Sequence, residues 1–160
     1  MVTAALDLDL QPLEGEPRPL GDWLTTFPLV PVVLDPFTHE SAWLLDTSRR
    51  ILQHFREADC RNCWIVTCSV DDAKRFLGPY ADDVLAFADP DGAVVKSLGI
   101  EQAPAFALLR QDGQVTAKAE GWDPVEWRVV AEAVAALTSW SRPNIPAAGD
   151  PVAYSGTPLG

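Results

Sequence analysis

The 160-residue sequence has few cysteines and no long apolar segment. Three cysteines are too few for a disulfide framework in a chain of this length, and they are consistent with a reducing compartment. No stretch approaches the roughly 18 consecutive apolar residues that a membrane helix needs. The first ten residues contain no basic residue and have the pattern of neither a signal peptide nor an anchor. We therefore expect a cytoplasmic protein that does not bind membranes.

Positive charge is also scarce. Twelve lysines and arginines stand against 23 aspartates and glutamates, which gives a net charge of -11. Such a surface repels phosphate backbones, so the composition argues against nucleic-acid binding. The hydrophobic content of 48% is enough for one domain-sized core. We expect an N-terminal arm with a short helix over residues 1–29, one domain over residues 30–140, and a proline-rich tail over residues 141–160 that packs through Trp140 and Tyr154.

The hydrophobic pattern predicts alternating strands and helices. Continuous apolar runs near residues 30–34, 64–68 and 84–88 are typical of strands buried on both faces of a sheet. Helical patterns follow them, most clearly over residues 41–56, and this order implies parallel strands joined by right-handed crossovers. Turn residues at 111–114 then indicate an antiparallel hairpin. The sequence thus predicts an α/β fold with a mixed central sheet and helices on both faces.

The order of elements and three short motifs resemble the thioredoxin-like superfamily. The segment Gly99 to Ala105 places Pro104 where that family has its cis-proline. The turns at Asp89 to Gly92 and Gln111 to Gln114 are most similar to those of the peroxiredoxin and thiol-reductase branches. The resemblance covers roughly residues 30–137, and it implies a thioredoxin-like fold.

The segment Thr38 to Ser41, which reads Thr-His-Glu-Ser, falls where the resemblance places the family's Cys-x-x-Cys. A hydroxyl forms neither a thiolate near neutral pH nor a mixed disulfide, so ordinary thioredoxin chemistry is excluded at this loop. A structural interpretation remains open, in which Thr38 caps a helix and Glu40 or Ser41 returns hydrogen bonds to its first turn. His39 could act as a base or a ligand, but the chain has only one other histidine. We therefore expect no catalytic residue, no metal and no cofactor.

Cys60 and Cys63 form a literal Cys-x-x-Cys and leave a redox alternative open. The motif follows a predicted helix C-terminus, where the helix dipole disfavours a thiolate. A helix of about 15 residues also separates it by roughly 20 Å from the Thr38 loop. We interpret both as structural thiols and Cys68 as part of the core. The alternative is a thiol-disulfide oxidoreductase or thiol peroxidase-like enzyme that uses Cys60 and Cys63.

Two tryptophans and Pro104 are predicted to form an apolar rim around the loop. Trp43 and Trp122 have polar or proline neighbours, so we expect both to be partly exposed; packing in the core is the alternative. Such rims bind extended peptides in redox-active relatives, so the resemblance implies a protein or peptide partner. We predict a binding or regulatory module rather than an enzyme, and exposed tryptophans with the tail could also form a homodimer. The candidate groove consists of Thr38, His39, Ser41, Trp43, Pro104 and Trp122.

Overall fold

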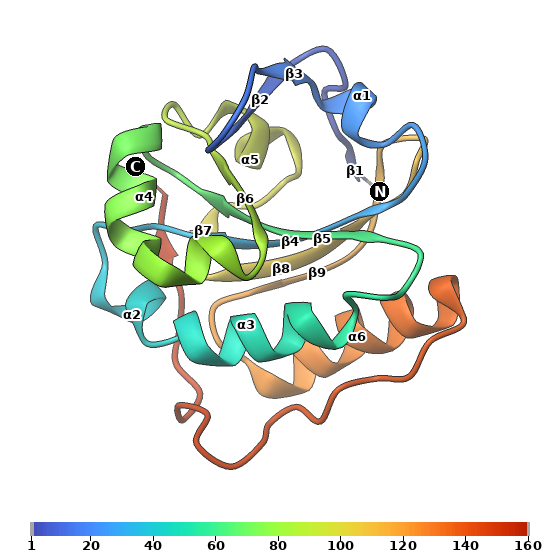
Figure 1. The fold of residues 1–160 in the computed structure, drawn as a ribbon. Coiled ribbons are helices and arrows are strands. Elements are labelled where there is room, and N and C mark those ends of the chain that lie inside the picture. The colour runs from blue at the N-terminus through green and yellow to red at the C-terminus, as the bar shows by residue number, and fades with distance from the viewer. Residues whose placement is uncertain (1, 160) are drawn as a thin grey trace.

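The computed structural model describes residues 2–159, which fold around an eight-stranded mixed sheet (Figure 1). The strands lie in the order β1-β9-β8-β4-β5-β6-β2-β3. Their bounds are β1 (Val2–Thr3), β2 (Asp9–Pro12), β3 (Arg18–Pro19), β4 (Leu29–Leu34), β5 (Arg61–Val66), β6 (Leu85–Ala88), β8 (Ala105–Leu109) and β9 (Gln114–Glu120). A separate two-stranded sheet pairs β7 (Gln102–Ala103) with β10 (Thr157–Pro158).

The three parallel strands β4, β5 and β6 form the centre of the sheet. All six residues of β4 are buried, as its uninterrupted apolar sequence predicts. Strand β8 runs antiparallel to β4 and pairs Ala105 with Val33. The carboxyl ends of β4 and β5 and the start of β8 therefore lie at one edge of the sheet. This edge brings together the loop after Leu34 and the turn that contains Pro104.

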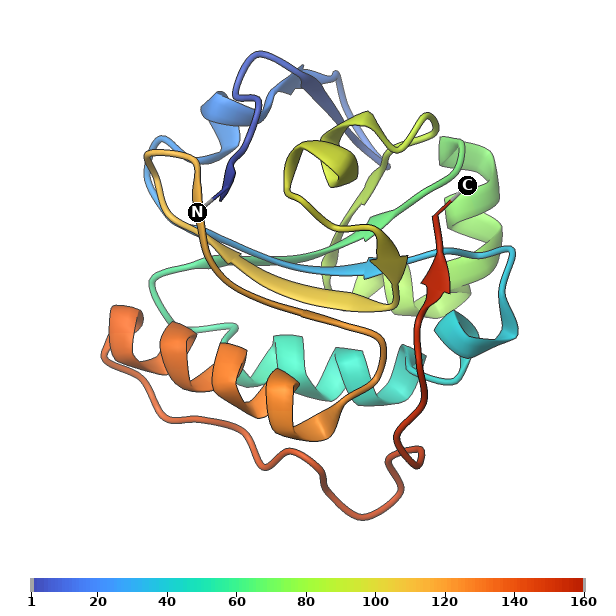
Figure 2. The ribbon, with the colours of Figure 1, turned by 180° about the vertical axis from the view of Figure 1, so that it is seen from behind.

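Helices cover both faces of the sheet (Figures 1 and 2). Buried residues of α3 (Leu45–His54), α4 (Val70–Leu77) and α6 (Pro124–Thr138) belong to one core cluster. Buried residues of α1 (Leu20–Trp23) and α5 (Ala93–Ser97) belong to the other. A short helix α2 (His39–Ala42) and a 3-10 helix (Gly78–Asp82) complete the set. This arrangement confirms the predicted α/β fold with a mixed sheet.

The helix predicted over residues 41–56 is two helices, α2 and α3. The break falls at Leu44, whose φ of -99° and ψ of 5° leave the helical region. Leu44 is fully buried, and the hydroxyl of Ser41 accepts a hydrogen bond from the backbone N–H of Asp35, the residue after β4. Helical propensity describes neither the burial of Leu44 nor this hydrogen bond.

The C-terminal segment follows a defined course along the domain (Figures 1 and 2). The indole of Trp140 donates to the carbonyl of His54 at 2.9 Å, and Ile145 is buried in the core. Farther on, the Asp150 carboxylate accepts hydrogen bonds from Arg50 at 2.7 Å and from Thr47 at 2.8 Å. The chain then reaches β7 and pairs with it as β10. Over residues 2–159, no helix combines the length and apolarity that crossing a membrane requires.

Candidate functional site

The loop after β4 is tied to the end of that strand through Asp35. The Asp35 carboxylate accepts a hydrogen bond from the backbone N–H of Phe37 at 3.0 Å. Its backbone carbonyl accepts from the Thr38 hydroxyl at 3.1 Å, and its backbone N–H donates to Ser41 Oγ at 2.9 Å. Backbone and side chain of one residue therefore hold the whole loop, as in turns built on an Asp side chain.

Thr38 and Ser41 occupy the two positions predicted to replace a dithiol, and their oxygens lie 3.3 Å apart. Ser41 is completely buried. Thr38 stands at the N-cap position of α2 but makes no capping hydrogen bond, because its hydroxyl is turned toward the strand. The predicted capping role of Thr38 is wrong. Both hydroxyls instead form hydrogen bonds with the backbone of Asp35 and hold the loop at the end of β4.

The two histidines do not meet at this loop. His39 is exposed on α2, whereas the His54 ring lies on α3 with Nε2 3.0 Å from the carbonyl oxygen of Ser141. A nucleophilic hydroxyl needs a base within hydrogen-bond reach, and Thr38 and Ser41 are engaged with Asp35 instead. Within the described residues, no three histidine, cysteine or acidic side chains form a group that could hold a metal ion.

Pro104 lies beside the loop, at the same edge of the sheet. It is buried, and the Ala103-Pro104 peptide bond is cis. Because Ala105 pairs with Val33, the preceding proline lies next to the end of β4. Its carbonyl accepts a hydrogen bond from Gly121 at 2.8 Å, which joins this turn to the end of β9.

The two tryptophans of the predicted rim differ in exposure. Trp43 is 57% exposed, as expected, and its ring contacts that of Tyr154 edge to face at 5.5 Å between centroids. Trp122 is completely buried, so the expectation that it is partly exposed was wrong. The C-terminal segment covers it: Trp122 Nε1 donates to the carbonyl of Pro151 at 2.8 Å. Phe37, which the predicted groove did not include, lies in the loop and is 74% exposed.

Tyr154 is the contact through which the C-terminal segment reaches the loop. Its hydroxyl donates to the backbone carbonyl of Glu40 in α2. Burial raises the pKa of the Tyr154 hydroxyl, and the nearby charge of Glu40 raises it further, so the group remains a neutral donor. An aromatic residue among small and proline residues was the only sequence signal for this contact.

Cys60 and Cys63 lie at the opposite end of the parallel strands. Cys63 pairs with Pro31, well before the end of β4, and Cys60 directly precedes β5. Burial, with the charge of Asp59, raises the pKa of Cys60 to about 11, and burial also raises the pKa of Cys63. Both are free thiols that stay protonated near neutral pH. The predicted separation from the Thr38 loop is therefore present in the structure.

Cys68 is the thiol at the same edge as the loop, since it comes two residues after β5 ends. It is 4% exposed. Burial, with the charges of Asp72 and Asp35, raises its pKa to about 12. The backbone N–H of the preceding residue, Thr67, donates to the carbonyl of Leu34 at 3.1 Å, which places Cys68 beside the end of β4 with its thiol protonated.

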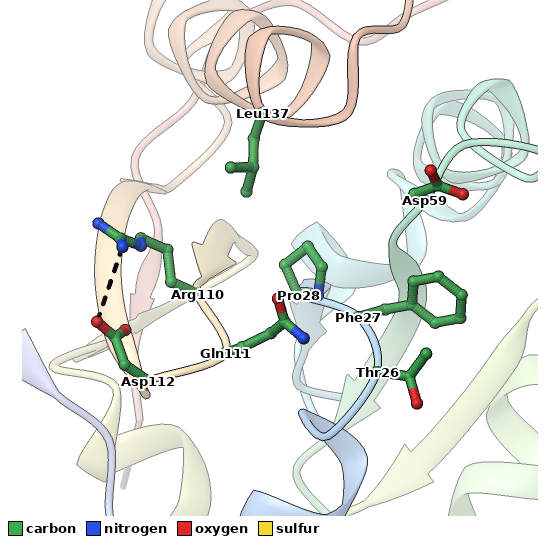
Figure 3. A pocket seen from close by; sticks show the side chains of 8 residues that line it. All are labelled: Thr26, Phe27, Pro28, Asp59, Arg110, Gln111, Asp112 and Leu137. Atoms are coloured by element: carbon green, nitrogen blue, oxygen red, sulfur yellow. Dashed lines mark ion pairs between the residues drawn. The ribbon is translucent and has the colours of Figure 1, made fainter.

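A hollow of about 600 Å³ lies away from this edge, between the β8–β9 turn, the start of β4 and the end of α6 (Figure 3). The Leu137 side chain points from α6 toward the loops, and Arg110 pairs with Asp112 at 3.9 Å (Figure 3). The lining of the hollow includes Asp59 but no cysteine, so the hollow does not open onto Cys60. The lining residues are Thr26, Phe27, Pro28, Asp59, Arg110, Gln111, Asp112 and Leu137.

No protein-family model and no curated protein matches the sequence. Solved structures do match. A peroxidoxin, BcpB, from Mycobacterium tuberculosis is 19% identical, with a TM-score of 0.64 over 87% of this chain and 97% of its own. The exposed lipoprotein thioredoxin Etrx1 from Streptococcus pneumoniae is 15% identical, with a TM-score of 0.63 over 80% and 97%.

A secreted disulfide oxidoreductase from Mycobacterium tuberculosis that is homologous to DsbE of E. coli is also similar. It is 20% identical, with a TM-score of 0.55 over 71% of this chain and 83% of its own. Identities this low establish a shared fold and carry no assignment of individual site residues. The strand order, the helices on both faces and these likenesses agree with the sequence prediction: the chain has a thioredoxin-like fold.

Proposed function

We propose that this protein is a thioredoxin-fold binding module that recognises an extended segment of a protein partner and has no dithiol–disulfide exchange activity at its strand-to-helix loop. The observation that carries the proposal is the pair of hydroxyls at Thr38 and Ser41, both hydrogen-bonded to the backbone of Asp35. Exchange requires a thiolate that attacks a disulfide sulfur, and neither hydroxyl can supply one.

Peptide binding is supported by strand β7, which directly precedes Pro104 beside the loop. Strand β7 already pairs in antiparallel fashion with an extended segment, the chain's own β10. Adding an extended strand to a sheet edge is a common mode of peptide recognition, in which the main chain supplies hydrogen bonds and side-chain contacts supply specificity. Phe37 and Trp43 are exposed aromatic side chains at the same edge and offer apolar contact area.

A second candidate function is a thiol redox enzyme. The similar structures described above are a peroxidoxin, a thioredoxin and a disulfide oxidoreductase, and these names favour the redox enzyme over a binding module. In this chain such an enzyme would use Cys60 and Cys63, which are buried and protonated. The start of β5 would have to open before either thiol could react.

Assays of peroxide consumption and disulfide reduction separate the two candidates. We expect the wild-type chain and its Cys60→Ser variant to show the same background rate. Turnover by the wild type that is lost in Cys60→Ser would replace the binding module with the redox enzyme. A Ser155→Ala variant is the matched control, because Ser155 is exposed and far from Cys60 in the sequence.

A further inference from the structure

We propose that residues 151–159 are an internal peptide ligand of the surface formed by β7 and Trp122, and that the protein partner binds by replacing them with a segment of the same pattern: a tyrosine and, two residues later, a glycine. The inference rests on the proposed function, because it identifies the occupant of the same peptide-binding edge. It adds the chemistry of the partner and explains why Trp122 is buried.

The contacts of this segment are those of a bound peptide. The backbone N–H of Trp122 donates to the carbonyl of Tyr154 at 2.9 Å, and the backbone N–H of Tyr154 donates to the carbonyl of Trp122 at 3.0 Å. Thr157 then pairs with Ala103, and Leu159 N–H donates to the carbonyl of Glu101 at 2.9 Å. These are main-chain bonds, so any extended peptide in the same register could make them.

Specificity comes from Tyr154 and Gly156. The Tyr154 hydroxyl reaches the carbonyl of Glu40, while its ring lies against Trp43. A Cβ added at Gly156 would lie 2.9 Å from Gln102 Cβ and 3.1 Å from Gly121 Cα. Only glycine permits this approach of two backbones. A fitting segment therefore carries tyrosine and glycine at this spacing.

Charge further restricts the partner. Residues 151–159 contain no charged side chain, whereas the residues that adjoin them include Glu40, Glu101 and Asp123, and also Glu120, which is paired with Lys118 at 3.5 Å. An acidic segment would be repelled from this surface, and a neutral or basic one would not. The partner segment is therefore neutral or basic.

The surface keeps its shape by contacts that do not involve the tail. Glu120 Oε1 accepts hydrogen bonds from the backbone N–H groups of Glu101 and Gln102 at 2.6 and 3.0 Å. Gly121 N–H donates to the carbonyl of Pro104. A preorganised edge of this kind remains available for another peptide when the tail leaves.

The anchor of the tail is also separate from its ligand-like part. Asp150 has a side chain that is 5% exposed and is held by Arg50 and Thr47 on α3. Residues 151–159 can therefore detach while Asp150 stays bound. A tether of this kind keeps the internal ligand at a high local concentration.

The test uses a chain that ends at Asp150 and a labelled synthetic peptide of residues 151–160. We expect the peptide to bind the shortened chain, a Gly156→Ala peptide to bind at least tenfold more weakly, and a Ser155→Ala peptide to bind like the wild type. The full chain should bind the wild-type peptide at least about tenfold more weakly, because its own tail competes at an effective concentration on the order of 1 mM. A folded shortened chain that does not bind the peptide would overturn the inference.

A second measurement keeps the inference testable if the shortened chain does not fold. In the full-length Gly156→Ala variant, we expect hydrogen exchange at the Trp122 amide to become at least about tenfold faster, since that amide bonds to Tyr154. The Gly121 amide, which bonds to Pro104, should be unchanged. Added wild-type peptide should restore protection at Trp122. If both amides accelerate together, the tail is an inseparable part of the fold and the inference is wrong.

An alternative occupant of the surface formed by β7 and Trp122 is the tail of a second copy of this chain. Light scattering that shows a dimer of the full chain, and a monomer of the shortened chain, would assign the surface to that tail and overturn the inference of a different partner. Cysteine-dependent turnover would instead contradict the proposed function and leave peptide binding unaffected. The two failures are therefore distinguishable.

Discussion

Removal of the Ser41 hydroxyl should destabilise the fold without affecting any activity. Ser41 is completely buried, and its Oγ accepts the hydrogen bond of the Asp35 N–H at 2.9 Å. In Ser41→Ala the shorter side chain offers no acceptor, so the N–H at the end of β4 loses its partner. Thr38 cannot replace it, because its hydroxyl is directed at the carbonyl of Asp35.

The size of the effect follows from the burial of the two partners. Leaving a buried donor without an acceptor costs about 1–3 kcal/mol of unfolding free energy. Asp35 is only half-buried, so water can reach part of the loop, and the lower part of that range applies. We expect a loss of about 1–2 kcal/mol, because removing a single oxygen also leaves little empty space. At about 2–4 °C per kcal/mol for a domain of this size, Tm should fall by about 2–8 °C.

Urea denaturation of Ser41→Ala, with the slope of the transition held in common with the wild type, measures this loss. Ser155→Ala is the matched control: its side chain is exposed, and it should stay within about 0.5 kcal/mol of the wild type. If Ser41→Ala unfolds at the same urea concentration as the wild type and the control, the hydroxyl does not hold the loop and is free for another role.

Two further predictions concern the thiols and the tail. Burial raises the pKa of Cys60 from 9.0 to about 11 and also raises the pKa values of Cys63 and Cys68, so the stability that these thiols contribute should be complete below pH 9 and fall as the pH rises above 9. Urea midpoints at pH 8 and 10 measure the fall, which should be smaller in Cys60→Ser because two buried thiols remain; a fall as large as that of the wild type would show that Cys60 does not contribute. Asp150→Ala removes the acceptor of Arg50 and Thr47 and should lower the unfolding free energy by about 1–3 kcal/mol, or by less if the tail detaches. Asp150→Asn should retain part of the stabilisation, because it keeps an acceptor oxygen. Unchanged stability and unchanged hydrogen exchange at the Trp122 amide in Asp150→Ala would contradict this anchor.

The central strands could be predicted from the sequence because their signals are local. An uninterrupted apolar run marks β4, and turn residues at 111–114 mark the hairpin of β8 and β9. The position of the loop at the sheet edge followed from the order of these elements. The far location of Cys60 and Cys63 followed in the same way, from the helix between them and the loop.

Features that depend on distant pairs of residues could not be predicted. The burial of Trp122 depends on Pro151 and Tyr154, which belong to a segment without any periodic pattern. The break between α2 and α3 falls at Leu44, which is completely buried in the core, and helical propensity does not describe that burial. In both cases a tertiary contact decided the local structure.

The claim that the hydroxyls of Thr38 and Ser41 exclude dithiol–disulfide exchange at this loop can be tested by replacing both residues with cysteine. In a Thr38→Cys, Ser41→Cys double variant, the thiol at position 38 stands at the N-cap of α2, where the positive end of a helix favours a thiolate, and the thiol at position 41 lies buried next to it. Insulin reduction measures dithiol–disulfide exchange, and the Thr38→Cys single variant is the control that has no second thiol at this loop. We predict a background rate for the wild type and the single variant, and a rate well above it for the double variant. A wild-type rate equal to that of the double variant, and abolished by Cys60→Ser, would contradict the claim.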